Sequence, residues 1–234
     1  MTKFYNFTIF CLLIVSFLLD IKSLQGQDFK LDIKNNLVFY ENSLHLNIQY
    51  SISVYDNEQI NPHYSLDMNI KKNANNYLLA LPGSNIFLCK SSMIMVNNRD
   101  RKIVYNPHSE AEFKASLNKL TSLNIEDILS TNDSVIFIGY RQGSKVYSIY
   151  SSKLSIKHTQ IYLDSTTNRF ARIEYDYPKQ KGKKSKAIIE FNYLPTTDLF
   201  FNNGFYEQNY VRLSEKKLKV SPTFKGYELV VVKD

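Results

Sequence analysis

The stretch from Ile156 to Tyr193 contains three strand-like segments joined by two polar turns. The segments are IKHTQIYLD, RFARIEYDYP and AIIEFNY, and the turns cover Ser165–Asn168 and the lysine-rich Lys179–Lys186. Alternation of apolar and polar side chains is typical of half-buried strands, and short polar connections favour antiparallel neighbours. This stretch therefore predicts an antiparallel β-meander.

The segment from Leu44 to Val54 shows the most regular alternation in the chain. Its apolar residues all fall on one face of a strand, and the residues between them are polar. Such a pattern indicates an antiparallel strand with one side against apolar material and the other against water. The apolar face consists of Leu44, Leu46, Ile48, Tyr50, Ile52 and Val54.

The rest of the chain predicts more strands and little helix. Ser109 is a plausible N-cap, and helical spacing follows it, so we expect a helix from Ser109 to Leu120 and a second short one over 124–129. Residues 27–43 fit either a short helix or an irregular lead-in. Further strands are expected over 66–70, 77–81, 86–89, 93–96, 103–105, 135–140, 146–150 and 227–232. The fold class is therefore mainly β (α+β), and the absence of a repeat or a composition break favours one domain.

The first 26 residues have the organisation of an export signal. Lys3 supplies the positive start, Phe4–Leu19 the apolar run, and a polar exit leads to a cleavage point near Gly26. The run is shorter than the ~20 residues that span a bilayer. We therefore expect an exported product comprising residues 27–234, located in the periplasm or secreted, depending on the host.

Removal of the export signal determines the net charge and the cysteine content of the mature chain. Removal of residues 1–26 leaves 27 basic (29 − 2) and 21 acidic (22 − 1) residues, a net charge of +6. Cys89 is then the one remaining cysteine, so no intramolecular disulfide can form, and its apolar surroundings predict a buried side chain.

Catalytic signatures are missing from the sequence. It contains no G-x-S-x-G, H-E-x-x-H, Walker A or G-x-G-x-x-G motif, and its four histidines lack metal-ligand spacing. We therefore expect a protein that is not an enzyme, with no cofactor and no nucleic-acid partner. The alternative is an active site assembled from distant polar residues, such as Asp, His and Tyr.

The lysine-rich turn has two interpretations. Lysines at a hairpin tip are usually solvated and discourage pairing between sheet edges. The alternative is contact with an anionic membrane surface, for which the candidates are Lys181, Lys183 and Lys184.

The apolar strand faces also leave two interpretations open. The chain has 17 Tyr and 15 Phe, several of them on strand faces, which is compatible with an ordinary filled β core. The alternative is a concave sheet whose apolar side chains hold an acyl chain.

A family resemblance bears on this choice. The succession LHLNIQYSISVYD, SSMIMVNNRDRKIVYNP, YLDSTTNRFARIEYDYP and AIIEFNY resembles the outer-membrane lipoprotein carrier (LolA-like) family over residues 36–194, and PTFKGYELVVV resembles its closing strand. The resemblance implies an incomplete antiparallel β-barrel, a half-barrel with a helical insert on one side. It also implies a periplasmic protein, active in outer membrane lipoprotein sorting, that shelters acyl chains and transports them by binding and release.

The resemblance and the strand patterns together give a candidate site. We expect a monomer that binds lipoprotein acyl chains or another amphiphile on its apolar strand faces. The second hypothesis is a non-enzymatic assembly or docking factor of the cell envelope, with envelope proteins as partners. The candidate ligand-binding residues are Leu46, Ile48, Tyr50, Ile52, Ile161, Leu163, Ile173, Tyr175, Ile189 and Phe191.

Overall fold

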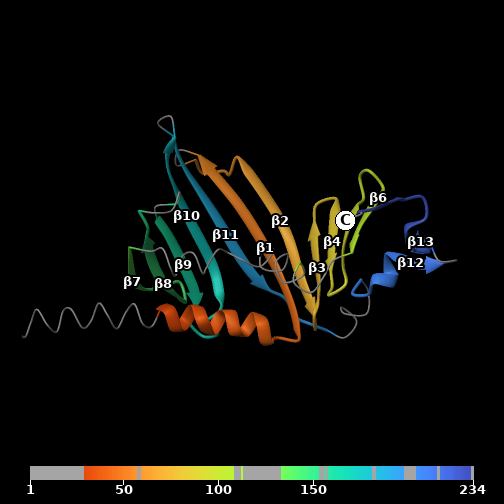
Figure 1. Ribbon diagram of the computed structural model, residues 1–234. Helices are drawn as coiled ribbons and strands as arrows, with labels where there is room; N and C mark the ends of the chain where they lie inside the picture. The colour runs from red at the N-terminus through yellow and green to blue at the C-terminus, as the bar shows by residue number, and fades with distance from the viewer. Residues whose placement is uncertain are drawn as a thin grey trace, which may run out of the picture. The chain divides into compact units, whose positions relative to one another are not determined.

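The computed structural model describes most of the chain beyond the expected export signal (Figure 1). The signal segment lies outside the described residues, as do the expected helices over 109–129 except for the helical Glu112. The side chains of Lys181, Lys183 and Lys184 also lie outside the description. The described residues are 29–56, 59–107, 112, 133–152, 156, 158–180, 183–197, 204–214 and 217–232.

Strands make up most of the described chain. The longest are β1, β2, β10 and β11, and two short 3₁₀ helices, η1 (Glu207–Asn209) and η2 (Pro222–Phe224), lie near the C-terminus. The strands are β1 (His45–Asp56), β2 (Tyr64–Asn73), β3 (Asn76–Leu81), β4 (Ser84–Leu88), β5 (Ser92–Asn97), β6 (Lys102–Pro107), β7 (Ser134–Arg141), β8 (Ser144–Tyr150), β9 (His158–Asp164), β10 (Phe170–Gln180), β11 (Lys183–Tyr193), β12 (Val211–Ser214), β13 (Lys217–Val220) and β14 (Glu228–Val231).

Twelve of these strands form one sheet in the order β14-β6-β5-β4-β3-β2-β1-β11-β10-β9-β8-β7. Every pair whose register is known is antiparallel except β14 with β6, which is parallel. Within the described residues the end strands β14 and β7 do not pair with each other, so the sheet is not closed. The predicted fold class, an incomplete antiparallel sheet with a helical element, is confirmed.

The lysine-rich turn is tighter than expected. β10 continues to Gln180 and β11 begins at Lys183, so most of the predicted turn from Lys179 to Lys186 has extended backbone. The predicted turn was too long because its lysines are polar and flank a glycine, which is typical of turns. Lysine is also common in strands at the edges of sheets.

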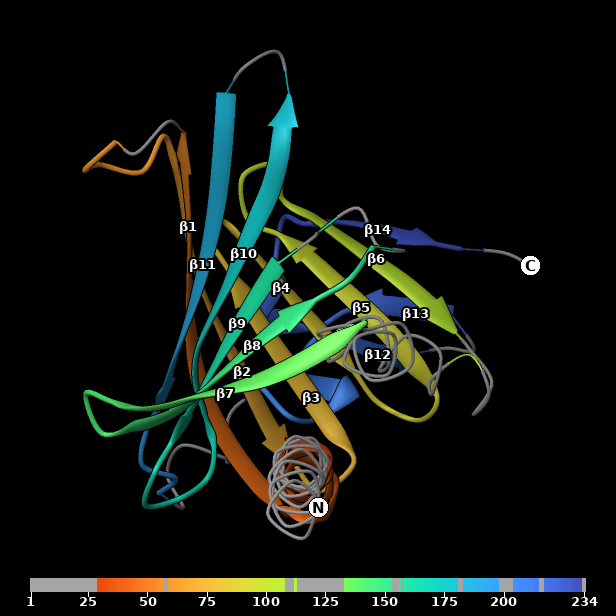
Figure 2. The ribbon, with the colours of Figure 1, turned by 90° about the vertical axis from the view of Figure 1, so that its left-hand side faces the viewer.

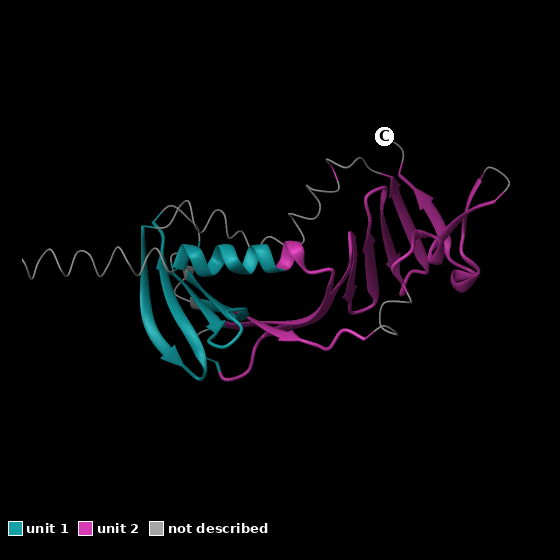
Figure 3. Cartoon of the chain, turned by 90° about the horizontal axis from the view of Figure 1, so that it is seen from below, with its two compact units in different colours: residues 1–39, 56–59, 125–187 teal, residues 40–55, 60–124, 188–234 magenta. Residues whose placement is uncertain are grey.

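Contacts divide the chain into two compact units (Figure 3). Unit 1 comprises residues 1–39, 56–59 and 125–187, and unit 2 comprises 40–55, 60–124 and 188–234. The chain passes between the units several times, and β11 contributes to both. The single domain over 27–234 stays a prediction.

A helix over residues 29–42 precedes the first strand, which decides between the two possibilities left open for the lead-in. Its buried residues are Phe29, Asp32, Ile33 and Asn36, at the i, i+3, i+4 and i+7 positions of one helix face. Two of these four are polar, so the hydrophobic period is weak in the sequence. Within the described residues, no helix is long and apolar enough to cross a bilayer.

In unit 1 this helix is fastened to the strands by polar contacts around Asp32. The carboxylate accepts hydrogen bonds from Tyr147 Oη at 2.7 Å and Asn168 Nδ2 at 3.0 Å, and Lys145 Nζ lies 3.2 Å away. Asn36 accepts a hydrogen bond from the backbone N–H of Phe170 at 3.2 Å. The buried polar side chains of the helix therefore meet partners on β8 and on the β9–β10 turn, and Figure 2 shows β7 to β10 side by side.

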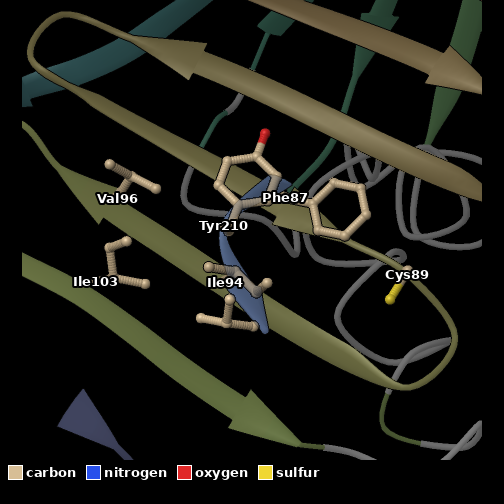
Figure 4. Close-up of a cluster of buried hydrophobic side chains, with 7 residues drawn as sticks. Phe87, Cys89, Ile94, Val96, Ile103 and Tyr210 are labelled. Atoms are coloured by element: carbon tan, nitrogen blue, oxygen red, sulfur yellow. The ribbon is translucent and has the colours of Figure 1, made fainter. Parts of the chain in front are cut away.

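In unit 2 the core lies between the sheet and the C-terminal segment (Figure 4). Tyr210 stacks on Phe87 of β4 at 5.2 Å between ring centroids and on Phe224 of η2 at 5.7 Å. Cys89 is buried in this cluster, as the sequence predicts. The buried members are Phe87, Cys89, Ile94, Val96, Ile103, Tyr210 and Val211.

Asp164 closes the β9–β10 turn and generates a first prediction. Its Oδ1 accepts hydrogen bonds from the backbone N–H groups of Thr166 and Thr167 and from Thr167 Oγ1, and these bonds hold the pKa of the carboxyl below its usual range. Asp164→Ala is expected to lower the free energy of unfolding by about 1–2 kcal/mol at pH 7. Urea denaturation measures this loss.

The pH dependence of this loss tests its cause. Because the folded-state pKa is depressed, the stabilisation is present above the unfolded-state pKa of ~3.9 and disappears as the pH falls through the folded-state value. The difference between wild type and Asp164→Ala should therefore shrink at acid pH. An unchanged difference would contradict a role for the ionised carboxylate.

Candidate ligand-binding face

One face of the unit 2 sheet carries an unbroken line of apolar side chains, which we call the apolar row. Its members lie directly opposite one another on successive strands, so they share one face. With neighbouring strands ~4.8 Å apart, the six steps from β1 to β14 give the row a length of ~29 Å. The row consists of Ile48, Ile70, Leu79, Ile86, Met95, Val104 and Val230.

The exposed members of the apolar row lie at its β5–β14 end. Ile48 and Leu79 are 1% and 8% exposed, Ile70, Ile86 and Val104 are half-buried, and Met95 and Val230 are 38% and 37% exposed. Methionine is flexible and polarizable, and it adapts to irregular apolar partners. The β5–β14 end is therefore the part of the row that a ligand can reach.

Strands β4 and β5 carry apolar side chains on both faces of the sheet. Ile86 and Met95 point to the apolar row, while Phe87 and Ile94 point to the core under the C-terminal segment. Antiparallel sheets usually turn one face to water and alternate accordingly. Here both faces are apolar, and the described C-terminal elements cover only the face opposite the row.

Charged residues lie beside part of the apolar row on each side. On one side Lys72 is buried, and its Nζ donates hydrogen bonds to the carbonyl oxygens of Tyr40 at 2.9 Å and Glu41 at 2.7 Å, at the C-terminal end of the helix. Cations favour this helix end, and burial lowers the pKa of Lys72. On the other side the next opposed set is Ser84, Asn97, Lys102 and Glu228, with Lys102 Nζ 3.3 Å from Glu228 Oε2.

The predicted site residues on β1 and on the end of β11 come together in unit 2. Tyr50 packs edge-on against Phe191 at 5.0 Å, and burial, with a smaller effect of Tyr193, raises the pKa of Tyr50 above its usual range. Leu46, Ile48 and Phe191 are buried, whereas Tyr50, Ile52 and Ile189 are half-buried. The β1 candidates share the face of the apolar row and extend it beyond Ile48.

The predicted site residues of unit 1 lie in a different environment. Ile161 is opposite both Tyr147 and Ile173, and the Tyr147 ring lies 5.1 Å from that of Phe29 on the helix. Ile161, Leu163 and Ile173 are fully buried. They form the helix–sheet core of unit 1. Tyr175 is half-buried, and burial, with a smaller effect of Tyr177, raises its pKa to about 12.

Sequence reasoning missed the larger part of the apolar row, on β2 to β6 and β14. Leu66, Met68 and Ile70 alternate visibly in the sequence. In β4 and β5, however, runs such as NIFL and MIMV are apolar at consecutive positions, so alternation cannot say which side chains share a face. Only the strand register shows which of these side chains lie on the same face. Apolar residues at both odd and even positions already indicate that both faces of a strand are covered.

A polar cluster in unit 1 brings Ser148, His158 and Asp176 together. His158 Nε2 lies 2.7 Å from Ser148 Oγ, and His158 Nδ1 lies 2.5 Å from Asp176 Oδ2. The ring of Tyr150 stacks on His158 at 4.8 Å. His158, on β9, is therefore engaged by side chains from the two neighbouring strands, β8 and β10.

The order of groups in this cluster is that of a nucleophile, a base and an orienting carboxylate. Ser148 is only 1% exposed, however, so its hydroxyl is closed to a substrate. We interpret the cluster as a set of side-chain hydrogen bonds that links β8, β9 and β10 and stabilises the sheet. In the part of the chain that the structure describes, no group of His, Cys, Asp and Glu side chains is arranged to hold a metal ion.

Comparison with known proteins gives structural neighbours alone. No protein-family model matches the sequence, and no curated protein matches it. Solved structures similar to this chain include an uncharacterized conserved protein from Thermus thermophilus, at 11% identity and a TM-score of 0.42, covering 86% of this chain and 99% of that one.

Two further neighbours carry family names. A LolA superfamily protein from Nitrosomonas europaea is 6% identical with a TM-score of 0.27, covering 68% of this chain and 90% of that one. A domain assigned to outer membrane lipoprotein sorting from Vibrio parahaemolyticus is 6% identical with a TM-score of 0.33, covering 77% and 97%. The solved structures similar to this chain thus include a LolA superfamily protein and a lipoprotein-sorting domain, both at low identity.

Proposed function

We propose that this protein is an exported, non-enzymatic carrier that binds the acyl chains of a lipoprotein or another amphiphile and releases them unchanged. The observation that carries the proposal is the apolar row, a second apolar face of the unit 2 sheet whose β5–β14 end is exposed. The expected export signal and the family resemblance favour the periplasm as the compartment and lipoprotein sorting as the process.

The dimensions of the row suit an acyl chain. The hydrocarbon core of a bilayer is ~30 Å thick, so a chain within one leaflet spans ~15 Å. The whole row is ~29 Å long, and a chain that enters at the exposed β5–β14 end, which spans two strand steps or ~10 Å, would continue over the half-buried Ile86 of β4. Each CH₂ group removed from water contributes about 0.8 kcal/mol, so burial along the row can hold a chain without a polar anchor.

Reversible transport follows from the same chemistry. Apolar burial is non-directional and scales with area, so it does not select one chain structure and it sets no single exit position. The half-buried Met68, Met93 and the exposed Met95 on this face can repack around different chains. Transfer then needs only an acceptor with a larger or better shielded apolar surface.

Two adjacent residues of β14 test the proposed face. Val230 belongs to the apolar row and is 37% exposed, while Val231 points to the opposite face and is 42% exposed. Val230→Glu is expected to weaken binding of a fluorescent fatty acid roughly tenfold or more, because a carboxylate must be desolvated against the chain. The affinity is measured by fluorescence titration.

The matched control is Val231→Glu, which makes the same chemical change one residue away on the other face. It should bind the fatty acid like wild type, and thermal unfolding should show both variants folded. Equal loss of affinity in the two variants, or no loss in Val230→Glu, would exclude the apolar row as the ligand site. Ile48→Glu and Phe191→Glu are also expected to abolish binding, but both replace buried residues and so require the same folding check.

Native mass spectrometry separates a carrier from an envelope docking factor. The mature chain is purified from its own compartment without detergent, and the carrier proposal predicts added masses that vanish on organic extraction and prove to be acylated molecules. A clean mass of the chain alone, with no uptake of offered lipids or lipopeptides, would instead favour the docking factor.

The non-enzymatic assignment has its own test at Ser148. A fluorophosphonate probe labels serine nucleophiles activated by a histidine. Because the Ser148 hydroxyl is buried, we expect no labelling of the folded protein, and the Ser148→Ala variant serves as the blank. Labelling of wild type that disappears in Ser148→Ala would overturn the assignment and make the Ser148–His158–Asp176 cluster a hydrolytic centre.

A further inference from the structure

The β12–β13 hairpin of unit 2 combines an exposed leucine with a set of cations. The hairpin is a two-stranded sheet of its own, in which Val211 pairs with Val220 and Leu213 with Leu218. Leu218 and Val220 pack against the core cluster. Leu213 lies at the hairpin end on the same side and is 76% exposed.

The cations of the hairpin lie on the face opposite this leucine. Arg212 pairs with Lys219 on the outer face, and Lys217, at the start of β13, pairs with Ser214 on the same face. All three are exposed, as is Lys225 in the turn after η2. The sequence from 211 to 227 contains five basic residues and one acidic residue, a net charge of +4.

We propose that the β12–β13 hairpin docks this protein on an anionic membrane surface. Leu213 enters the headgroup region, and Arg212, Lys217 and Lys219 lie against lipid phosphates. Cations attract an anionic leaflet, and an apolar side chain near the end of the hairpin gains contact with the acyl boundary when the hairpin enters end-on. This surface is separate from the apolar row, so the proposal does not depend on the bound cargo.

The composition of the hairpin favours lipid over an acidic protein as the partner. Protein interfaces concentrate their binding energy in a packed apolar or aromatic centre surrounded by a polar rim. Here the described cations occupy one face of a short hairpin, and a single exposed leucine lies near its end on the other face. A hairpin that enters the headgroup region end-on brings its cationic face against phosphates without requiring a shaped pocket.

Vesicle co-sedimentation of the full mature chain tests the proposal. Wild type should bind mixed phosphatidylcholine–phosphatidylglycerol vesicles and not pure phosphatidylcholine vesicles. Each cation near the surface contributes about fivefold to the partition coefficient, so Lys217→Gln with Lys219→Gln should lower it on the order of twentyfold or more. Leu213→Ser should lower it several-fold further, and its effect should persist when salt screens the charges.

The matched control makes the same charge change elsewhere. Lys30 and Lys34 are exposed on the helix, and Lys30→Gln with Lys34→Gln should change the partition coefficient less than twofold. Circular dichroism and thermal unfolding confirm that each variant is folded. An equal loss in the control pair would show attraction by net charge alone, and both that result and a wild type that ignores anionic vesicles would overturn the proposal.

The two proposals can fail independently. Val230→Glu, which is expected to weaken fatty-acid binding, should leave vesicle binding unchanged, and the lysine pair on β13 should leave fatty-acid binding unchanged. A vesicle affinity that falls in Val230→Glu would instead place the membrane contact on the apolar row and exclude the hairpin.

Discussion

Strands β4 and β5 carry apolar side chains on both faces of the sheet. The packing of unit 2 is determined by which elements cover each of these two faces. One face is covered by Tyr210, Val211 and the segments around η2, which stack on Phe87 and enclose Ile94 and Ile103. The other face continues across seven strands as the apolar row and becomes more exposed toward β14. Burial of the exposed end of the row against an apolar partner would contribute ~25 cal/mol for each Å² removed from water, which is the physical basis of the proposed binding face.

Unit 1 removes its apolar face from water in another way. Its helix lies over Tyr147, and the contact is specified by polar groups: Asp32 is bound by Tyr147, Asn168 and Lys145. Breaking one partner of such a buried network leaves the others unpaired and is costly, so the network fixes the helix in one position. Ile161 and Ile173 are therefore permanently enclosed core residues. A ligand face and a core can thus arise from the same alternating strand pattern, and the covering element decides between them.

This difference explains what could be predicted from the sequence. The strands at Leu44–Val54 and in the β9–β10 meander were predictable because their side chains alternate and their turns are marked by residues such as Asp164. The helix over 29–42 was not, because two of its four inward positions, Asp32 and Asn36, are polar and find their partners more than a hundred residues away. The row across β4 and β5 was not predictable either, since consecutive apolar residues hide which face each occupies until the register is known.

The chemistry of the two units also bears on function. The one arrangement in the described residues that resembles catalytic machinery, Ser148 with His158 and Asp176, has its hydroxyl closed to solvent and lies across three paired strands, where it stabilises the sheet. The accessible apolar surface, in contrast, offers no polar group along its central line with which to orient a reacting bond. Catalysis requires polar groups that are held in place to stabilise the charge of a transition state. A carrier requires only an apolar surface that a ligand can cover and leave reversibly. Accessible apolar area without fixed charge suits a binding surface, and the proposed carrier function rests on this property of the apolar row.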